Sequence, residues 1–155
     1  MSIGEAACVS VHGANRLGSN SLLDLVVFGR AAAKRAASTI TPGANHASID
    51  NDATERVISR LDALRHADGS EPTAKLRDDM QRIMQTHAAV FRTGEVLEQG
   101  KQKLREVCEA FDHVKVSDRS MVWNTDLVET LELANLLGSA LVSIDAAANR
   151  TESRG

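Results

Sequence analysis

The sequence predicts an all-α protein, an antiparallel bundle of three to four helices over residues 50–150, preceded by a loop, a short strand and a helix. Apolar residues recur every three and four positions through most of the chain, which is the spacing of amphipathic helices. Aromatic residues make up only 3%, so the core must consist mainly of aliphatic side chains, which favours helices over a sandwich. The connections between helical segments are short, which favours antiparallel neighbours.

The first predicted helix begins near Ser21 and continues to about Ala37. Ser21 followed by Asp24 has the spacing of a capping box, and no proline interrupts the segment. Its first half, residues 22–28, is apolar on every face, which predicts burial inside a larger body. Residues absent from this chain would have to supply that cover.

A change of pattern near Pro42 predicts a domain boundary. The segment from Thr39 to Ser48 is polar and rich in turn-forming residues. We therefore expect three parts, namely residues 1–40, residues 50–150 and a short extension, residues 151–155.

Four further helices are predicted after this boundary. They are expected over about Asp52 to His66, Pro72 to Ala89, Thr93 to His113 and Asn124 to Ala148. Asp50 or Asn51 is expected to cap the first and Asn124 or Thr125 the last, while Pro72 suits the first turn of the second. The apolar stripes comprise Val57, Ile58, Leu61, Leu64, Leu76, Met80, Ile83, Met84, Val96, Leu97, Leu104, Val107, Cys108, Phe111, Leu127, Leu131, Leu133, Leu137, Leu141 and Ile144. Trp123 is interpreted as a plug between helices, with an interface anchor as the alternative.

Composition argues against several classes of function. The net charge is -3, with acidic and basic residues interleaved, so no basic stripe is available for nucleic acid. Cys8 and Cys108 are expected to be free thiols. No metal site is expected, because no pair among His46, His66, His87 and His113 has the spacing of a zinc helix. No membrane span or signal peptide is predicted, so we expect a soluble chain, and both ends resemble cuts in a longer one.

The segment from Gly4 to Leu23 contains the residues best suited to chemistry. Glu5 follows a glycine beside the β-like run Cys8–Val11 and could accept hydrogen bonds from sugar hydroxyls. Arg16 lies among glycines, and its forked guanidinium suits a carboxylate. The turn before Ser21 leads into a helix whose first N–H groups can hold an anion or an electron-rich ring edge.

These residues form a long motif that resembles a known family. GEAA at residues 4–7 and HGANRLGSNSL at residues 12–22 are similar to the late flavin-binding motif of succinate dehydrogenase and fumarate reductase flavoproteins. NRTESRG at residues 149–155 resembles a motif of that family's helical domain. By this resemblance, residues 1–40 are the end of the FAD-binding domain and residues 50–150 are the helical domain.

The resemblance implies roles for five residues. Glu5 would contact the ribose of FAD, and Ser21 and Leu22 would meet the flavin at the start of the helix. Arg16 would bind a carboxylate of succinate or fumarate, and His12 would line the same site. Electrons would pass from succinate through FAD to an iron–sulfur subunit and then to quinone, in a complex that also has membrane anchor subunits.

The chain also departs from the family's full pattern. The glycine-rich turn that holds the FAD pyrophosphate is absent, as are the histidine that carries covalent flavin and the proton-transferring arginine. No catalytic residue is therefore expected here, and the isolated chain should neither retain FAD nor turn over substrate. The resemblance implies a peripheral location, on the cytoplasmic side of a bacterial inner membrane or the matrix side of a mitochondrial one.

Other interpretations stay open from the sequence alone. The chain could be a helical module that docks an iron–sulfur subunit or an assembly factor without chemistry of its own. It could also come from a fumarate reductase, because the direction of the reaction cannot be determined from the sequence. An aspartate oxidase shares the flavin motif, but the long match around Arg16 to Asp24 favours the respiratory enzymes. Exposed apolar residues 22–28 would favour a homo-oligomer of the isolated chain.

Overall fold

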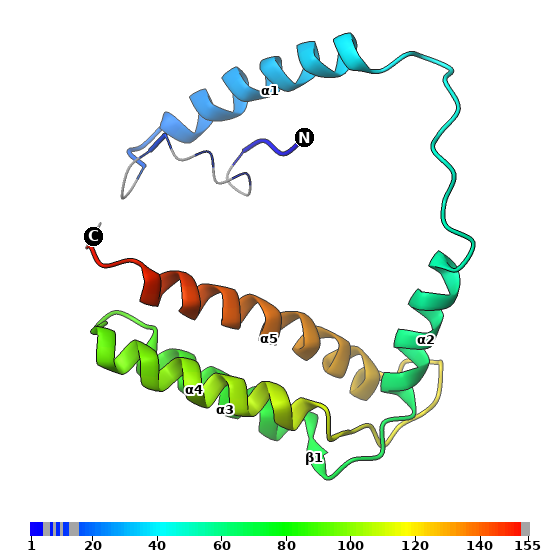
Figure 1. Cartoon of the computed structure of the whole chain (residues 1–155), viewed down its shortest axis with the longest axis vertical. Coiled ribbons are helices and arrows are strands. Elements are labelled where there is room, and N and C mark those ends of the chain that lie inside the picture. The colour runs from blue at the N-terminus through cyan, green and yellow to red at the C-terminus, as the bar shows by residue number, and fades with distance from the viewer. Residues whose placement is uncertain (5–6, 8, 10, 13–15, 153–155) are drawn as a thin grey trace. The chain divides into compact units, whose positions relative to one another are not determined.

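The computed structural model describes residues 1–4, 7, 9, 11–12 and 16–152. Within these residues the secondary structure is five α-helices and two strands of two residues each, which confirms the all-α prediction (Figure 1). Contacts divide the chain into two units, one of Met1–Ile49 with the residues after Thr151, and one of Asp50–Thr151. The β-like run predicted at Cys8–Val11 lies partly outside the described residues, and Val9 and Val11 are not in a strand.

The first unit contains helix α1, Asn20–Thr39. The helix was predicted to begin near Ser21, and it does so within one residue, but Ser21 does not cap it. The N-cap is Ser19, with a φ of 69°, and its side chain makes no capping hydrogen bond. The chain enters the helix through a left-handed turn, so Ser21 already has helical backbone and its hydroxyl instead accepts a hydrogen bond from Arg16.

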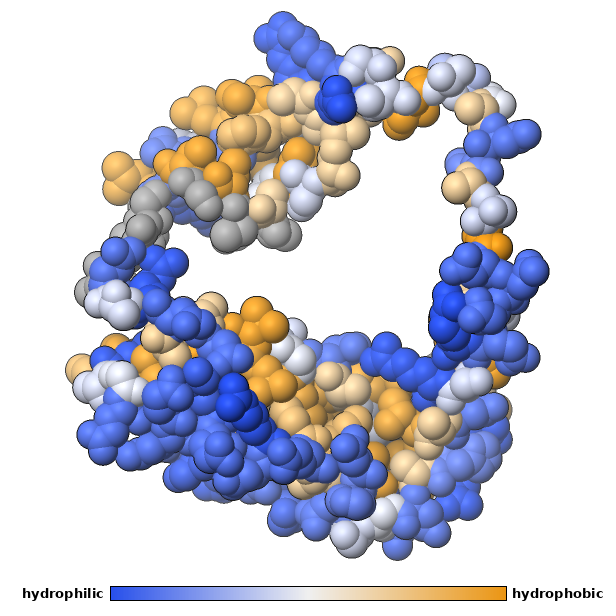
Figure 2. Space-filling model, in the orientation of Figure 1, coloured by the Kyte–Doolittle hydropathy of each residue, from blue (hydrophilic) through white to orange (hydrophobic). Residues whose placement is uncertain are grey.

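The apolar first half of α1 is largely exposed in this chain. Leu22, Leu23, Val26 and Val27 expose 58–70% of their surface, and Figure 2 shows hydrophobic surface over this helix. The N-terminal segment packs closely on α1 at Leu25. Gly4, which has a φ of +81°, lies so near that a Cβ on it would be 2.7 Å from the Leu25 side chain. Most of the apolar side chains of this half remain exposed, so their predicted burial is not seen in this chain, and cover by residues outside it stays a prediction.

The second unit contains α2 (Ala53–Arg65), α3 (Thr73–His87), α4 (Gly94–Phe111) and α5 (Thr125–Asn149). All four had been predicted, with ends within about two residues. Helices α3, α4 and α5 pack against one another, with successive helices running in opposite directions (Figure 1). Helix α2 packs against α5, so the unit is a three-helix antiparallel bundle with a fourth helix beside it.

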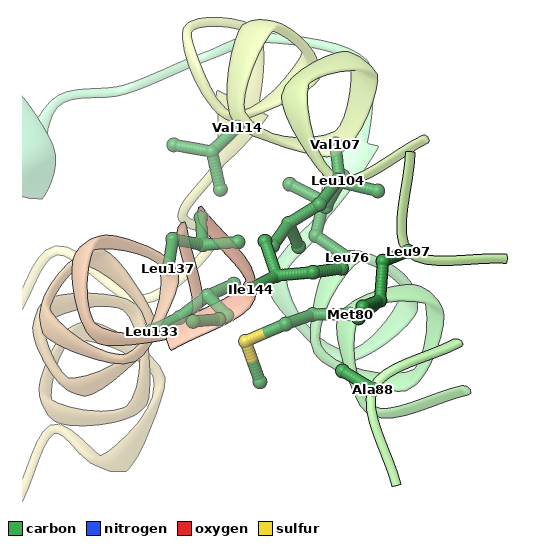
Figure 3. Packing of buried hydrophobic residues seen from close by; sticks show 11 residues of the cluster. Leu76, Met80, Ala88, Leu97, Leu104, Val107, Val114, Leu133, Leu137 and Ile144 are labelled. Carbon is green, nitrogen blue, oxygen red and sulfur yellow. The ribbon is translucent and has the colours of Figure 1, made fainter. Parts of the chain in front are cut away.

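The core lies between α3, α4 and α5. Figure 3 shows Leu133, Leu137 and Ile144 of α5 among side chains from the other two helices. The buried cluster consists of Leu76, Met80, Ala88, Leu97, Leu104, Val107, Val114, Leu133, Leu137, Ala140 and Ile144. The predicted stripes of these three helices thus supply the core. The stripe predicted for α2 is wrong in part, because Val57 and Ile58 are exposed and no residue of α2 is buried.

Asn124 caps α5 as predicted. Its Oδ1 accepts a hydrogen bond from the backbone N–H of Leu127 at 2.8 Å. The predicted cap of α2 is wrong, because Asp52 occupies the N-cap position and makes no capping bond. Arg56 draws the carboxylates of Asp50 and Asp52 toward itself, at 3.5 and 2.6 Å, and so competes with capping.

Two short strands had no signal in the sequence. Strand β1, Glu71–Pro72, pairs in parallel with β2, Val114–Lys115, and Pro72 precedes α3 as its N-cap rather than lying in its first turn. Gly69 permits this approach, because a Cβ there would overlap the carbonyl of His113. The strand pair therefore joins the segment that precedes α3 to the segment that follows α4.

Trp123 is not a plug between helices. Its φ is +54° and its surface is 95% exposed. The neighbouring side chains of Met121 and Val122 are also exposed. The left-handed backbone turns the indole outward just before α5 begins, so the alternative of an interface anchor stays open.

No membrane span was predicted from the sequence, but helix α5 meets the length and hydropathy criteria for one. The helix is 25 residues long, an 18-residue stretch within it has a mean hydropathy of 1.4, and it is the one helix in the described part of the chain long and apolar enough to cross a membrane. The core helix of a globular protein meets the same criteria. Six residues of α5 are buried, including Leu133, Leu137 and Ile144, and they pack in the core with α3 and α4. Val128, Leu136 and Val142 on the same helix are exposed, so packing in this chain accounts for only part of its apolar character.

Candidate functional site

The candidate site lies where the loop ending at Arg16 joins α1. The Arg16 guanidinium donates a hydrogen bond to the Ser21 hydroxyl at 2.9 Å. Between them, a turn closes through the backbone N–H of Asn20 and the carbonyl of Leu17 at 3.2 Å. The structure therefore brings together Arg16 and Ser21, which the sequence had assigned to a substrate and a cofactor.

The first turn of α1 lacks the groups that usually neutralise a helix N-terminus. It contains no acidic residue and has no side-chain cap. The backbone N–H of Leu22 bonds to the carbonyl of Ser19 at 3.0 Å, and the Leu22 side chain is 62% exposed. The positive end of the helix dipole thus carries no compensating charge from its own first turn.

A second contact joins the same loop to α1 one turn further on. His12 Nε2 lies 3.2 Å from Asp24 Oδ2, and the Asp24 side chain is only 5% exposed. Sequence reasoning treated Asp24 only as part of a capping box. The signal that could have found it is a single carboxylate inside the apolar run of residues 22–28.

These groups favour an anionic ligand. Arg16 supplies a permanent positive charge with paired donors, His12 supplies an imidazole, and the helix end supplies backbone dipoles. Asp24 is the one acidic residue of α1. Glu5, the proposed ribose contact, lies outside the described residues.

Other reactive groups lie elsewhere in the chain. Burial raises the pKa of the Cys108 thiol, with a smaller contribution from Glu109, which favours the protonated form of the sulfur. No group of three or more potential metal ligands occurs within residues 1–4, 7, 9, 11–12 and 16–152.

Comparison with known proteins identifies the family of the chain. A family described as fumarate reductase flavoprotein C-term matches residues 77–155, just over half of the chain. The chain belongs to this family. Membership confirms the resemblance seen in the sequence, and the match covers all of α4 and α5 and most of α3.

Two curated flavoprotein subunits align with all or nearly all of the chain. The succinate dehydrogenase flavoprotein subunit of Rickettsia bellii is 59% identical over 155 residues, which is 100% of this chain and 26% of that protein. A mitochondrial succinate dehydrogenase [ubiquinone] flavoprotein subunit of Xenopus laevis is 58% identical over 152 residues, 98% of this chain and 23% of that protein. The chain thus spans about a quarter of the length of these relatives.

Solved structures of the family share the fold. A structure of E. coli quinol fumarate reductase has a TM-score of 0.81 at 42% identity, over 99% of this chain and 26% of that one. The Sdh1 complex of Mycobacterium smegmatis has a TM-score of 0.66 at 26% identity, over 91% of this chain and 24% of that one. Both matches cover more of the chain than the helical unit alone.

Proposed function

We propose that this chain is the C-terminal part of the FAD-containing subunit of a succinate dehydrogenase, which oxidises succinate to fumarate. The observation that carries the proposal is the hydrogen bond from Arg16 to Ser21, because it unites an anion-binding side chain with an uncapped helix N-terminus. Identities of 56–59% to several succinate dehydrogenase subunits support this enzyme over fumarate reductase, for which one relative is 44% identical, although another succinate dehydrogenase subunit is 41% identical.

The residues present fit one edge of FAD. The first turn of α1, at Ser21 and Leu22, presents the positive end of the helix dipole and no acidic side chain to oppose an electron-rich ring, and its Leu22 N–H is held in the turn by the carbonyl of Ser19. Glu5 is proposed to accept hydrogen bonds from the ribose. When bound, FAD supplies the acceptor for the hydride that leaves succinate.

In this proposal Arg16 and His12 bind the substrate. Arg16 holds one carboxylate of succinate through its paired donors, and its bond to Ser21 fixes the guanidinium beside the helix end. His12 lines the same site, tied to α1 through Asp24. The proton-transferring residue is expected in the longer subunit, so this chain contributes binding and orientation.

The isolated chain is proposed to be inactive and not to retain FAD. It lacks the glycine-rich turn that would hold the pyrophosphate. After FAD is added and the excess removed, the chain should be colourless and should not reduce an added electron acceptor with succinate. A yellow or active preparation would contradict this part of the proposal.

The main test uses the complete subunit in its complex, with Arg16→Ala and Arg16→Lys. Loss of a bidentate contact to a carboxylate should lower kcat/KM for succinate roughly hundredfold in Arg16→Ala, while FAD stays bound. Arg16→Lys should recover only part, because an ammonium cannot reproduce the fork. Arg82→Ala, on the exposed face of α3, is the matched control. An Arg16→Ala enzyme with unchanged kcat/KM would remove Arg16 from the site.

The proposed partners are an iron–sulfur subunit and membrane anchor subunits. The complex would place this subunit peripherally, on the cytoplasmic side of a bacterial inner membrane or the matrix side of a mitochondrial one. The isolated chain is proposed to self-associate through the exposed apolar residues 22–28. Light scattering should then show a mass that rises with concentration, whereas a monomer at high concentration would count against it.

A second candidate is a docking module without chemistry of its own. It is favoured by the exposed apolar side chains of Met121, Val122 and Trp123, which could contact an iron–sulfur subunit or an assembly factor. The Arg16→Ala enzyme separates the two functions, since a docking role predicts unchanged kinetics in the assembled complex.

A further inference from the structure

Two side-chain contacts hold the same loop against α1. Arg16 donates to Ser21 at 2.9 Å, and His12 meets Asp24 at 3.2 Å. Ser21 and Asp24 are three residues apart on the helix, so they lie on one face, one turn from each other. The two ends of the segment from residue 12 to residue 16 are thus attached to adjacent turns of α1.

The chemistry of the second contact fixes one ring nitrogen. An ionised carboxylate only accepts hydrogen bonds, so His12 must present a hydrogen on Nε2 to Asp24. This leaves Nδ1 as the nitrogen for a second partner. A carboxylate that holds one nitrogen in this way sets the orientation of the imidazole.

Asp24 also has a feature that a purely structural aspartate would not need. Its side chain is 5% exposed, and Oδ1 is buried without a hydrogen-bond partner among the described residues. Most buried polar atoms in folded proteins are paired, because an unpaired one carries the full desolvation penalty. If this buried position served only packing, an apolar side chain would suit it better, like the Leu and Val residues around it in the sequence.

We propose that Asp24 is a positioning residue for His12, which holds the imidazole so that its other nitrogen can donate to a carboxylate of the dicarboxylate substrate. The inference rests on the proposed function, because it requires His12 to line the substrate site. Asp24 itself does not touch substrate. Its role is to fix the ring and to balance the charge of the imidazolium that faces the anion.

The direction of the effect on substrate binding separates this role from others. If Asp24 acted only through its negative charge, replacing it with Asn would strengthen binding of a dianion. If it acted only in folding, replacement would lower the FAD-loaded fraction but leave the Kd of the folded fraction unchanged. Positioning predicts weaker binding, since the imidazole loses both its orientation and its counter-charge.

The test measures the Kd of the complete, FAD-loaded complex for fumarate by calorimetry, together with KM and kcat for succinate. Asp24→Asn should raise Kd and KM about tenfold, with a smaller change in kcat, as loss of a hydrogen bond to a charged group predicts. Asp24→Glu should recover part of the affinity. Asp78→Asn is the matched control, because Asp78 forms an exposed ion pair with Arg82 on α3.

A double-mutant cycle makes the assignment specific to His12. In a His12→Ala background, Asp24→Asn should weaken fumarate binding no further, because the residue it positions is gone. Tighter or unchanged fumarate binding by the Asp24→Asn single variant would overturn the proposal. An additional loss of binding from Asp24→Asn in the His12→Ala background would overturn it as well. If Asp24→Asn loses FAD, the cycle is run with Asp24→Glu, and an unchanged Kd there would also overturn it.

Failure of this inference can be told apart from failure of the proposed function. If Arg16→Ala weakens fumarate binding while Asp24→Asn does not, only the role of Asp24 is wrong. If neither substitution changes Kd or KM, the proposed substrate site itself is wrong.

Discussion

Replacing Gly100 with alanine should destabilise the helical unit, although alanine is the better helix former. Gly100 is buried on α4, and a Cβ there would lie 2.5 Å from the Cβ of His87 and 2.7 Å from the Ile144 Cδ1. The end of the Ile144 side chain can rotate away, but the His87 Cβ moves only with the backbone of α3. The helices must therefore shift, and such overpacking costs about 1–3 kcal/mol.

Gly138 provides the matched control for this substitution. It lies within α5, and a Cβ there would meet nothing within 4 Å. Gly138→Ala should stabilise the unit by up to about 1 kcal/mol through helix propensity alone. The same gain applies at Gly100, so the difference between the two variants isolates the overpacking, about 1–3 kcal/mol.

The assay is urea unfolding of the chain, followed by helical circular dichroism for both variants and the parent. The midpoint of Gly100→Ala should lie well below that of Gly138→Ala, with similar slopes. Equal stability of the two variants would refute the close packing of α3, α4 and α5 at this point.

Three further predictions concern the turn before α5. Trp123 is the only tryptophan and is exposed, so its fluorescence should match that of indole in water and be quenched by iodide; a blue-shifted, protected emission would contradict the outward turn. Asn124→Ala should cost about 1–2 kcal/mol of unfolding free energy, because it removes the cap at Leu127 and the bonds to the carbonyls of Asp118 and Ser120. Thr93→Ala, at a longer capping bond, should cost less, and equal losses in urea unfolding would argue against this difference. The backbone N–H of Ser120 lowers the pKa of Asp118 below its ordinary value of 3.8; the resulting stability is present above that value and is lost as pH falls below it. The stability difference between the parent and Asp118→Asn should therefore shrink in acid, and a difference independent of pH would contradict the assignment.

The sequence predicted the helices of the second unit because their apolar stripes and caps are local signals. Leu76, Met80, Leu104, Leu133 and Ile144 recur at helical spacing and meet in one core. The β1–β2 pair could not be predicted, because two-residue strands have no periodicity and depend on Gly69 approaching His113 across the sequence. The backbone of Trp123 likewise depends on its tertiary setting.

The candidate site was only partly predictable. The motif indicated Arg16 and Ser21, and their hydrogen bond follows from their closeness in sequence. The contact of His12 with Asp24 spans 12 residues and depends on how the loop folds onto α1, so spacing alone did not reveal it. The cap of α2 was predicted wrongly because Arg56 binds the carboxylate of Asp50, one of the two residues expected to cap the helix, and that of Asp52 at the N-cap position.

The most direct test of the central claim is a chimera. This chain would replace the matching 155 residues of the Rickettsia bellii succinate dehydrogenase flavoprotein subunit, to which it is 59% identical, and succinate oxidation by the assembled complex would be measured. We expect the chimera to hold FAD and oxidise succinate, and to lose that activity with Arg16→Ala. A folded chimera that holds FAD but does not oxidise succinate would contradict the claim that this chain supplies part of the substrate site.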